Sequence, residues 1–372
     1  MPRSIAEVNA IRRSNQRLTE TSAPGQPVGH GRHGYDPNQP RLPSGHHDGG
    51  QWTDEPGSDG PAVPRREVAL DESGEEAWES VTSSHRPDGT LAEQEVINRD
   101  GSRIHSQFSR DPRIAGWDER HTVILPDGQQ VTFENSGDVQ TTYYADGQPI
   151  SASVWSSRGP EALPIMQQAF FQAAPVVGAA AGEVLGVELG VLAAAAALFT
   201  WLSSRNTRDG TAVLAFKAGD YRKNDKPEVA LVGRLTRDEV KKTCKELDDV
   251  QGRTDKAVDF VRKKGEYMGP ADFGTKVHKM IADGINGENR PDYKAEVSGM
   301  KSGQAAAKYG QKGSIRIDAY ERLDEISTTC VYDPKTGERG LSLPRMMELA
   351  QTAYRLFGTK RMIVIEVRPG QQ

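Results

Sequence analysis

The chain has 372 residues, which is long enough for more than one domain. Hydrophobic residues make up only 35% of it, a share that argues against one compact globule over the whole length and predicts a disordered portion. The formal net charge is -5, yet residues 261–372 carry more Lys and Arg than Asp and Glu. This local excess is compatible with a polyanionic substrate and equally with a solvated surface.

Two features bear on the compartment in which the protein acts. Cys244 and Cys330 are the only cysteines, too few for a disulfide framework or a four-thiolate metal site, and we expect both to be reduced. That expectation favours a reducing compartment. The first twenty residues contain no apolar stretch, so we expect no signal peptide, and any export would need a dedicated secretion machine.

Four segments differ in composition and periodicity. Residues 1–66 are rich in Gly, Pro and His and predict a disordered tail. Residues 67–158 alternate apolar and polar side chains around Asp-Gly turns at 100/101, 127/128 and 146/147, which predicts a small antiparallel β-meander. Residues 159–205 form a hydrophobic segment that predicts helix. Residues 206–372 are dense in regular patterns and predict the C-terminal domain.

The hydrophobic segment contains an apolar run at 173–204 that is long enough to cross a bilayer, but Glu183 and Glu188 lie in its middle. Glycines recur at every fourth residue and predict a smooth strip on one helix face, suited to close helix contact in lipid or in a bundle. These glycines are Gly178, Gly182, Gly186 and Gly190. Two interpretations stay open: a helical hairpin that is soluble or held by a chaperone, and a segment that inserts into a membrane.

The C-terminal domain is predicted to contain both strands and helices. Strands are expected at 211–219 and 228–236, and Thr236 with Glu239 makes a capping box that begins a helix over 237–250. The last hundred residues then follow the order helix, three strands, helix and strand. This order predicts an α/β domain whose mixed sheet is flanked by helices.

Side-chain alternation in the second of those three strands, residues 314–323, predicts two different faces. One face is expected to hold Ile315, Ile317 and Ala319, and the other Arg316 and Asp318.

The third strand adds another acid. Asp333 and Lys335 share a face because the side-chain period is two, so Asp318 and Asp333 are expected to converge with Lys335 beside them. Two close carboxylates are tolerated where a divalent cation neutralises them. A lysine next to them orients or deprotonates an attacking water, or holds a phosphate oxygen. His278, on the predicted helix, adds an imidazole that suits Mn²⁺ as well as Mg²⁺.

Two further acids lie on neighbouring strands. Glu296 is either an additional acid of the site or a charge at a strand end, and the second role is the one we favour. Glu366 is expected to pair with Arg368 or another base.

Four short motifs follow one another within about residues 270–368: Gly274-Thr275-x-Val277-His278, Gly313 followed by Ile317-Asp318, Asp333-x-Lys335-Thr336-Gly337, and Gln351-x-x-Tyr354. This series resembles the successive motifs of RecB-like nucleases of the PD-(D/E)XK superfamily. The resemblance implies a restriction-endonuclease-like fold for the C-terminal domain. It also implies a metal-dependent deoxyribonuclease, a hydrolase of phosphodiester bonds.

The resemblance implies a metal site and a catalytic lysine. The ligands of Mg²⁺ or Mn²⁺ would be His278, Asp318 and Asp333, together with the backbone carbonyl of Pro334. Lys335 would be the catalytic lysine.

The resemblance also implies a role for the last motif. Gln351 and Tyr354 would contact DNA or brace the lysine, although the family more often spaces this pair as Gln-x-x-x-Tyr. The four cysteines of the iron-sulfur members are absent, so no cluster is expected.

The order of the parts resembles that of bacterial toxin effectors, in which the last domain does the damage. This implies DNA as the target, a protein cytoplasmic in the producer and secreted into the cytoplasm of a recipient cell, and partners that include an immunity protein and a secretion machinery or chaperone. One alternative is a phage-derived or repair nuclease. An alternative of another class is a membrane-acting protein that uses residues 173–204, with an inactive C-terminal domain.

Overall fold

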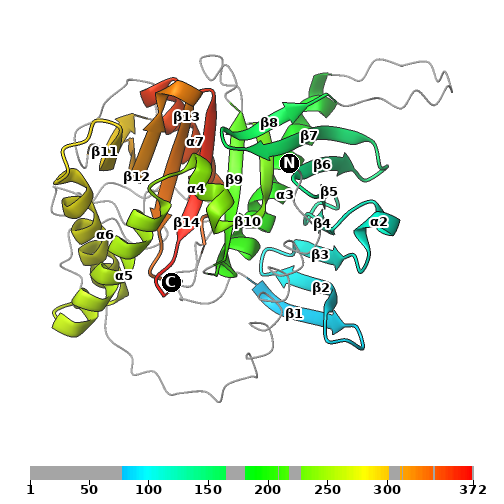
Figure 1. Cartoon of the computed structure of the whole chain (residues 1–372), viewed down its shortest axis with the longest axis horizontal. Coiled ribbons are helices and arrows are strands. Elements are labelled where there is room, and N and C mark those ends of the chain that lie inside the picture. Colours follow the sequence, from blue (N-terminus) through cyan, green and yellow to red (C-terminus); the bar gives the residue numbers. More distant parts are fainter. Residues whose placement is uncertain are drawn as a thin grey trace, which may run out of the picture.

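The computed structural model of the chain describes residues 78–164, 181–207, 209–217, 228–300, 311, 313–337 and 340–370. The predicted tail at 1–66 and Gly178 of the glycine strip lie outside the described residues. So do the side chains of 181–189, including those of Glu183 and Glu188. The described chain forms two β-sheets, with one helix between them and further helices on both faces of the second sheet (Figure 1).

The first sheet is an eight-stranded antiparallel meander, in which each strand pairs with the next along the chain. This confirms the predicted meander, but its last strand, Gly159–Leu163, lies in the segment 159–205 that was predicted to be helical, so that boundary is wrong. Its elements are β1 (Trp78–His85), β2 (Leu91–Asn98), β3 (Arg103–Phe108), the short helix α2 (Pro112–Ala115), β4 (Glu119–Ile124), β5 (Gln130–Ser136), β6 (Val139–Tyr144), β7 (Pro149–Ser156) and β8 (Gly159–Leu163).

The predicted Asp-Gly turns are present and share one geometry. Gly101, Gly128 and Gly147 have φ values of 86°, 87° and 81°, a region that glycine enters without a steric penalty. The aspartate before each glycine accepts a hydrogen bond from the backbone N–H two residues later, as Asp127 Oδ1 does from Gln129 at 3.0 Å. These local turns bring consecutive strands together and so produce the meander.

The second sheet has six strands in the order β10-β9-β14-β13-β12-β11, with β13 and β14 parallel and the other pairs antiparallel. The mixed sheet with flanking helices was predicted. Its elements in chain order are α3 (Ala181–Ser204), β9 (Gly210–Lys217), β10 (Glu228–Thr236), α4 (Arg237–Thr243), α5 (Leu247–Lys264), α6 (Pro270–Asn286), β11 (Tyr293–Met300), β12 (Ser314–Leu323), a 3-10 turn (Asp324–Ile326), β13 (Thr328–Pro334), α7 (Leu343–Phe357) and β14 (Arg361–Val367).

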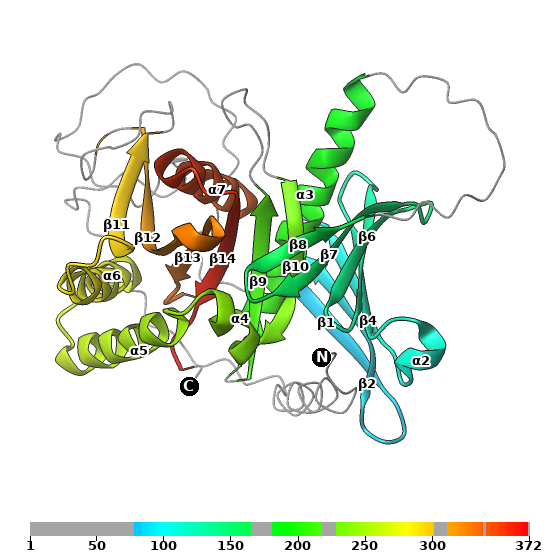
Figure 2. The same cartoon turned by 45° about the horizontal axis from the view of Figure 1, so that its top comes forward.

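Helix α3 lies between the two sheets (Figure 2). Leu198 and Phe199 are fully buried in a core that also contains Phe133 of the meander and Val364 of the second sheet. The hairpin interpretation is wrong for residues 181–204, because they form one continuous helix. None of the described helices is long and apolar enough to span a membrane.

The glycine strip has a neighbour at its last position. A Cβ atom at Gly190 would collide with the side-chain oxygen of Gln129, in the turn between β4 and β5. The close contact that the strip predicts therefore occurs at Gly190 with the meander rather than with another helix.

The two faces of the second sheet have separate cores. Helices α4, α5 and α6 cover one face, where Val258 and Ile281 pack with Tyr332 and Ile363. Helix α7 covers the other face, on the same side as α3. Strands β11 and β12 are therefore flanked by α6 on one face and α7 on the other.

Two sequence-based expectations fail around Cys244. The helix predicted over 237–250 is interrupted there, since Cys244 ends α4 with φ -94° and ψ 86°, and α5 begins at Leu247. Cys244 and Cys330 are joined by a disulfide, with their Cα atoms 5.8 Å apart, so the expectation of two reduced thiols is wrong. The fold brings together residues 86 positions apart, which no local pattern announces.

The alternation predicted for β12 holds for Ile315 and Ile317 but not for Ala319. The two isoleucines belong to the core under α7, whereas Ala319 belongs to the core under α5 and α6. The alternation of side chains between the two faces therefore shifts at Asp318. The neighbouring strand β11 departs from regular geometry at the same level, because Glu296 has φ 57°.

Candidate metal centre

Helix α6 delivers His278 to the sheet. Phe273, Val277, Ile281 and Ile285 form its buried stripe at helical spacing, and His278 follows Val277 at the margin of that stripe. The beginning of α6 lies close to the chain after β13, because a Cβ atom at Gly274 would be 3.3 Å from Thr336 Oγ1. The glycine thus permits the close approach of α6 to Thr336.

Strands β11 and β12 deliver two carboxylates from facing positions. Ala295 pairs with Ala319 and Val297 with Ile317, so Glu296 lies opposite Asp318. The positive φ of Glu296 interrupts the pleat, and the residues before and after it contribute to opposite cores. A left-handed conformation is uncommon for glutamate, and such departures concentrate at functional sites.

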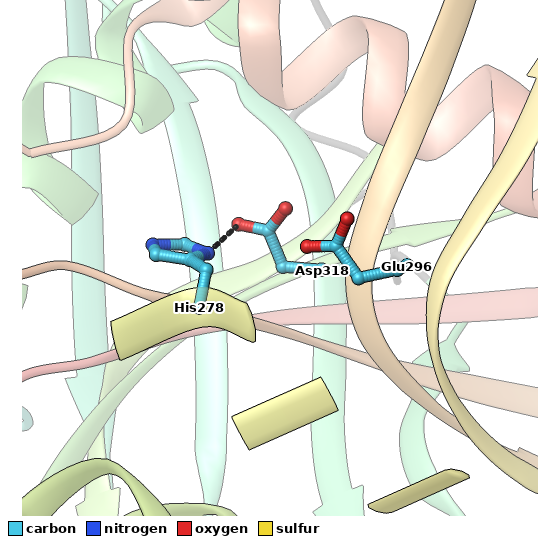
Figure 3. Close-up of side chains that lie close together, drawn as sticks. All are labelled: His278, Glu296 and Asp318. Atoms are coloured by element: carbon cyan, nitrogen blue, oxygen red, sulfur yellow. Dashed lines mark ion pairs between the residues drawn. The ribbon is translucent and has the colours of Figure 1, made fainter. Parts of the chain in front are cut away.

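His278, Glu296 and Asp318 form a cluster that we call the triad. Each offers one ligand atom, and the three atoms lie within 4.8 Å of one another. Figure 3 shows the imidazole of His278 and the carboxylate of Glu296 on either side of Asp318. His278 Nδ1 lies 3.4 Å from Asp318 Oδ2, and Glu296 Oε2 also pairs with Arg316 Nε at 2.9 Å.

Asp333, near the end of β13, and Lys335, just after it, lie beside the triad. Lys335 Nζ lies 2.6 Å from Asp333 Oδ2, and the Asp333 side chain is 1% exposed. Asp333 Oδ1 accepts no hydrogen bond from the described residues. A buried carboxylate oxygen without a donor is costly and marks a place where a cation or a ligand would be favourable.

Arg345, in the first turn of α7, connects the two aspartates. Its Nη2 lies 3.8 Å from Asp318 Oδ1 and 4.0 Å from Asp333 Oδ1, and it donates a hydrogen bond to the Arg316 carbonyl at 2.7 Å. Asp318 and Asp333 therefore converge, as the sequence predicts. Sequence reasoning missed Arg345, since nothing distinguishes it from the other basic residues of the domain.

Burial and charge act against each other on these groups. Burial works to raise the pKa of Asp318, but His278, Arg345 and Lys335 outweigh it and hold that pKa below its ordinary value. Burial works to lower the pKa of Lys335, but Asp333 and Asp318 outweigh it and the pKa is raised. Burial raises the pKa of Glu296 to about 7, although the charge of Arg316 opposes it.

The donor set fits a divalent metal ion. One imidazole nitrogen and two carboxylates are ligands that such ions take in proteins, and the three ligand atoms are close enough for one ion to contact all of them. The sequence-based ligand set was His278, Asp318 and Asp333. The structure groups Glu296 with the first two, and places Asp333 next to Lys335 instead.

Gln351 and Tyr354 lie on α7 and are half-buried. They follow Arg345 by six and nine residues, which is about 9 and 13 Å along the axis at about 1.5 Å per residue. Both therefore lie farther along α7 than Arg345, the residue of this helix that faces the aspartates. Thr352 and Leu356, between and after them, pack over Gly299 of β11.

Glu366 organises the segment between Lys335 and α7. It pairs with Arg368 at 2.6 Å, as predicted, and its other oxygen accepts a hydrogen bond from the Leu341 backbone N–H at 2.9 Å. Arg368 in turn donates to the Gly337 carbonyl at 3.1 Å. These contacts hold both ends of the segment that joins β13 to α7.

Comparison of the chain with protein-family models, with curated proteins and with solved structures gives no match.

Proposed function

We propose that the chain is a divalent-metal-dependent nuclease that hydrolyses phosphodiester bonds of DNA, a RecB-like member of the PD-(D/E)XK superfamily. The observation that carries this proposal is the convergence of the triad, His278, Glu296 and Asp318, with the ion pair of Asp333 and Lys335. Such a combination of acids, imidazole and amine suits phosphoryl chemistry, in which positioning and charge stabilisation supply most of the catalysis.

The order of elements supports a restriction-endonuclease-like arrangement. From α6 to β14 the chain runs helix, three antiparallel strands, helix and a strand parallel to the third. Within this unit the acids come from β11, β12 and β13, and the histidine from the preceding helix. The four quoted motifs lie on or next to α6, β12, β13 and α7, which supports the proposal.

In this proposal, His278, Glu296 and Asp318 hold Mg²⁺ or Mn²⁺. The bound ion supplies Lewis acidity toward a phosphate oxygen and an activated water. Because Asp318 keeps its charge and carries a lowered pKa, it is ready to bind a cation at neutral pH.

Lys335 acts as a cation in this proposal rather than as a base. Its raised pKa keeps the amine protonated at neutral pH, and Asp333 fixes its position at 2.6 Å. An ammonium held in this way orients the attacking water or binds a phosphate oxygen as negative charge develops.

We further propose that the protein is a bacterial toxin effector, delivered by a dedicated secretion system and neutralised in the producer by an immunity protein that covers the site. The order of the parts, in which the meander and α3 precede the proposed nuclease unit, supports this hypothesis. The meander, α3 and the second sheet share one core, so the described part would be delivered as a single folded unit.

A plasmid-nicking assay on the full chain tests the function. We expect Mg²⁺ or Mn²⁺ to permit nicking and EDTA to stop it, and Lys335→Ala to reduce the rate by about 100-fold or more. Lys245→Ala is the matched control, since Lys245 pairs with Glu325 at the surface, and its rate should equal that of the wild type. Metal-independent nicking, or equal loss in both variants, would contradict the proposal. The same assay on RNA decides between the two nucleic acids.

A further inference from the structure

Arg345 lies between the carboxylates of Asp318 and Asp333. Asp318 turns Oδ2 to His278 and Oδ1 to Arg345. Asp333 turns Oδ2 to Lys335 and Oδ1 to Arg345. The two Oδ2 atoms thus face different residues, His278 and Lys335. The two Oδ1 atoms face the same nitrogen, Nη2 of Arg345.

The contacts of Arg345 with these carboxylates are long. At 3.8 and 4.0 Å they exceed hydrogen-bond distance, and the short contact is with the neutral Arg316 carbonyl at 2.7 Å. A structural pair in the same sheet is different: Arg368 and Glu366 lie 2.6 Å apart, with the carboxylate fully buried. Arg345 is thus attracted by the charge of the aspartates without being fastened to them.

The surroundings of Arg345 permit its side chain to move away from the two aspartates. The Arg345 side chain is 27% exposed, and it comes from the first turns of α7 rather than from the sheet that carries the acids. A rotation of this side chain therefore requires no change in β12 or β13. Arginine stays charged at any physiological pH, so it cannot serve as a proton acceptor here.

We propose that Arg345 is an exchangeable counter-ion: it balances Asp318 and Asp333 in the metal-free protein, competes with the divalent cation for Asp318, and binds a phosphate of the substrate once the cation has bound Asp318. The proposal rests on the metal centre proposed above. Like charges a few ångströms apart repel strongly in a site that excludes water. Metal and substrate binding are consequently coupled, because each removes the obstacle to the other.

The coupling has a direct consequence for metal affinity. Without the guanidinium charge, no side chain of residue 345 competes with the metal for the carboxylate. The metal should therefore bind more tightly when no nucleic acid is present. The same change removes a phosphate ligand, so cleavage should become slower. A residue that only supports the fold would not move these two quantities in opposite directions.

The test is a calorimetric titration of Mn²⁺ into the full chain without nucleic acid. We expect Arg345→Gln to bind Mn²⁺ roughly five-fold or more tightly than the wild type, at the lower end of common coupling factors. Arg345→Lys, which keeps the charge, should bind Mn²⁺ like the wild type. Arg355→Gln, on the same helix, is the matched control for the loss of an arginine, and its affinity should not change.

Plasmid cleavage at saturating Mn²⁺ completes the test, with Arg345→Gln expected to be about ten-fold slower or more. Unchanged or weaker Mn²⁺ binding in Arg345→Gln, with a wild type that binds Mn²⁺, would overturn the counter-ion role and leave the nuclease proposal standing. A wild type that binds no Mn²⁺ would overturn both. Tighter binding together with slower cleavage supports the inference, and Arg345→Met, which also removes the charge, replaces the glutamine variant if that variant fails to fold.

Discussion

Glu296 combines a strained backbone with a buried charge. Its φ of 57° and its burial, which raises its pKa to about 7, both cost stability in the metal-free protein. Both costs are explained if the carboxylate serves the metal, since functional residues are often retained at the expense of stability.

Replacing Glu296 by glycine should separate these two effects. We expect Glu296→Gly to weaken Mn²⁺ binding by about ten-fold or more, because one ligand is lost. In the absence of metal, the free energy of unfolding should rise by about 1 kcal/mol as the strain and the buried charge are removed. Urea denaturation and calorimetry measure the two quantities. A less stable Glu296→Gly protein would contradict this account, and Glu296→Gln, which keeps the backbone strain, is the matched control.

Glu321 is a buried acid outside the metal centre. Its Oε2 accepts hydrogen bonds from Tyr332 Oη at 2.9 Å and from the Glu246 backbone N–H at 3.1 Å, at the start of α5. Burial raises the pKa of Glu321, although these two hydrogen bonds oppose it. It lies three residues after Asp318 on the same strand and forms no part of the triad.

The raised pKa of Glu321 predicts a pH dependence of stability. Between the ordinary carboxyl pKa and the raised native one, the native state binds more protons than the unfolded state, so this group's contribution to stability decreases as the pH rises. Glu321→Gln keeps an acceptor oxygen but cannot ionise. We expect it to be more stable than the wild type at pH 8, with the difference shrinking toward pH 5 in urea denaturation. Parallel pH profiles for the two proteins would exclude this role for Glu321.

Individual site residues were predictable to different degrees. His278, Asp318, Asp333 and Lys335 stand at motif spacing on predicted elements, and the structure brings them together. For Glu296 the favoured role, a charge at a strand end, is wrong, because it lies within β11 and groups with His278 and Asp318. Its left-handed backbone was not predictable, since the sequence carries none of the Gly or Asn signals for that conformation. Arg345 was missed because its role depends on where α7 packs.

At the scale of elements, the disulfide between Cys244 and Cys330 links the end of α4 to β13, the strand that carries Asp333. Both cysteines are fully buried, so reagents reach the bond only when the structure opens. The pairing depends on the sheet order and could not be read from two isolated cysteines.

The double variant Cys244→Ser with Cys330→Ser should lose about 2–4 kcal/mol of unfolding free energy, because a cross-link over a long loop restricts the unfolded chain. Denaturation without reducing agent measures this loss. Adding a reductant should lower the stability of the wild type and leave the double variant unchanged. Equal stabilities of the two oxidised proteins would contradict the expectation.

Helix α3 is the element whose environment the sequence left undecided. Its apolar composition is compatible with lipid or with a protein core, and only the partners distinguish the two. In the structure Phe199 has no exposed surface and lies in the core that joins both sheets. The strand periods and turns were local and therefore predictable, whereas this packing was not.

At the scale of the whole molecule, the shared core predicts that the two sheets unfold together. Gln140 of the meander adds to this, since its amide donates to the Val232 carbonyl and accepts from the Val232 N–H at 2.9 Å. Phe199→Ala should destabilise the protein by about 3–5 kcal/mol. Hydrogen exchange should show the loss in both sheets. Loss of protection in one sheet alone would mean that they are independent domains.

The central claim is that Glu296, within β11, and Asp318, within β12, belong to a metal-dependent hydrolytic site. The most direct test compares plasmid cleavage in Mg²⁺ by the full-length wild type, Asp318→Asn and Glu321→Gln, the two variants removing buried carboxylates from one strand. The account predicts that Asp318→Asn loses about 100-fold or more of the rate while Glu321→Gln retains it. Cleavage that survives in Asp318→Asn, or is absent from the wild type, would contradict the account.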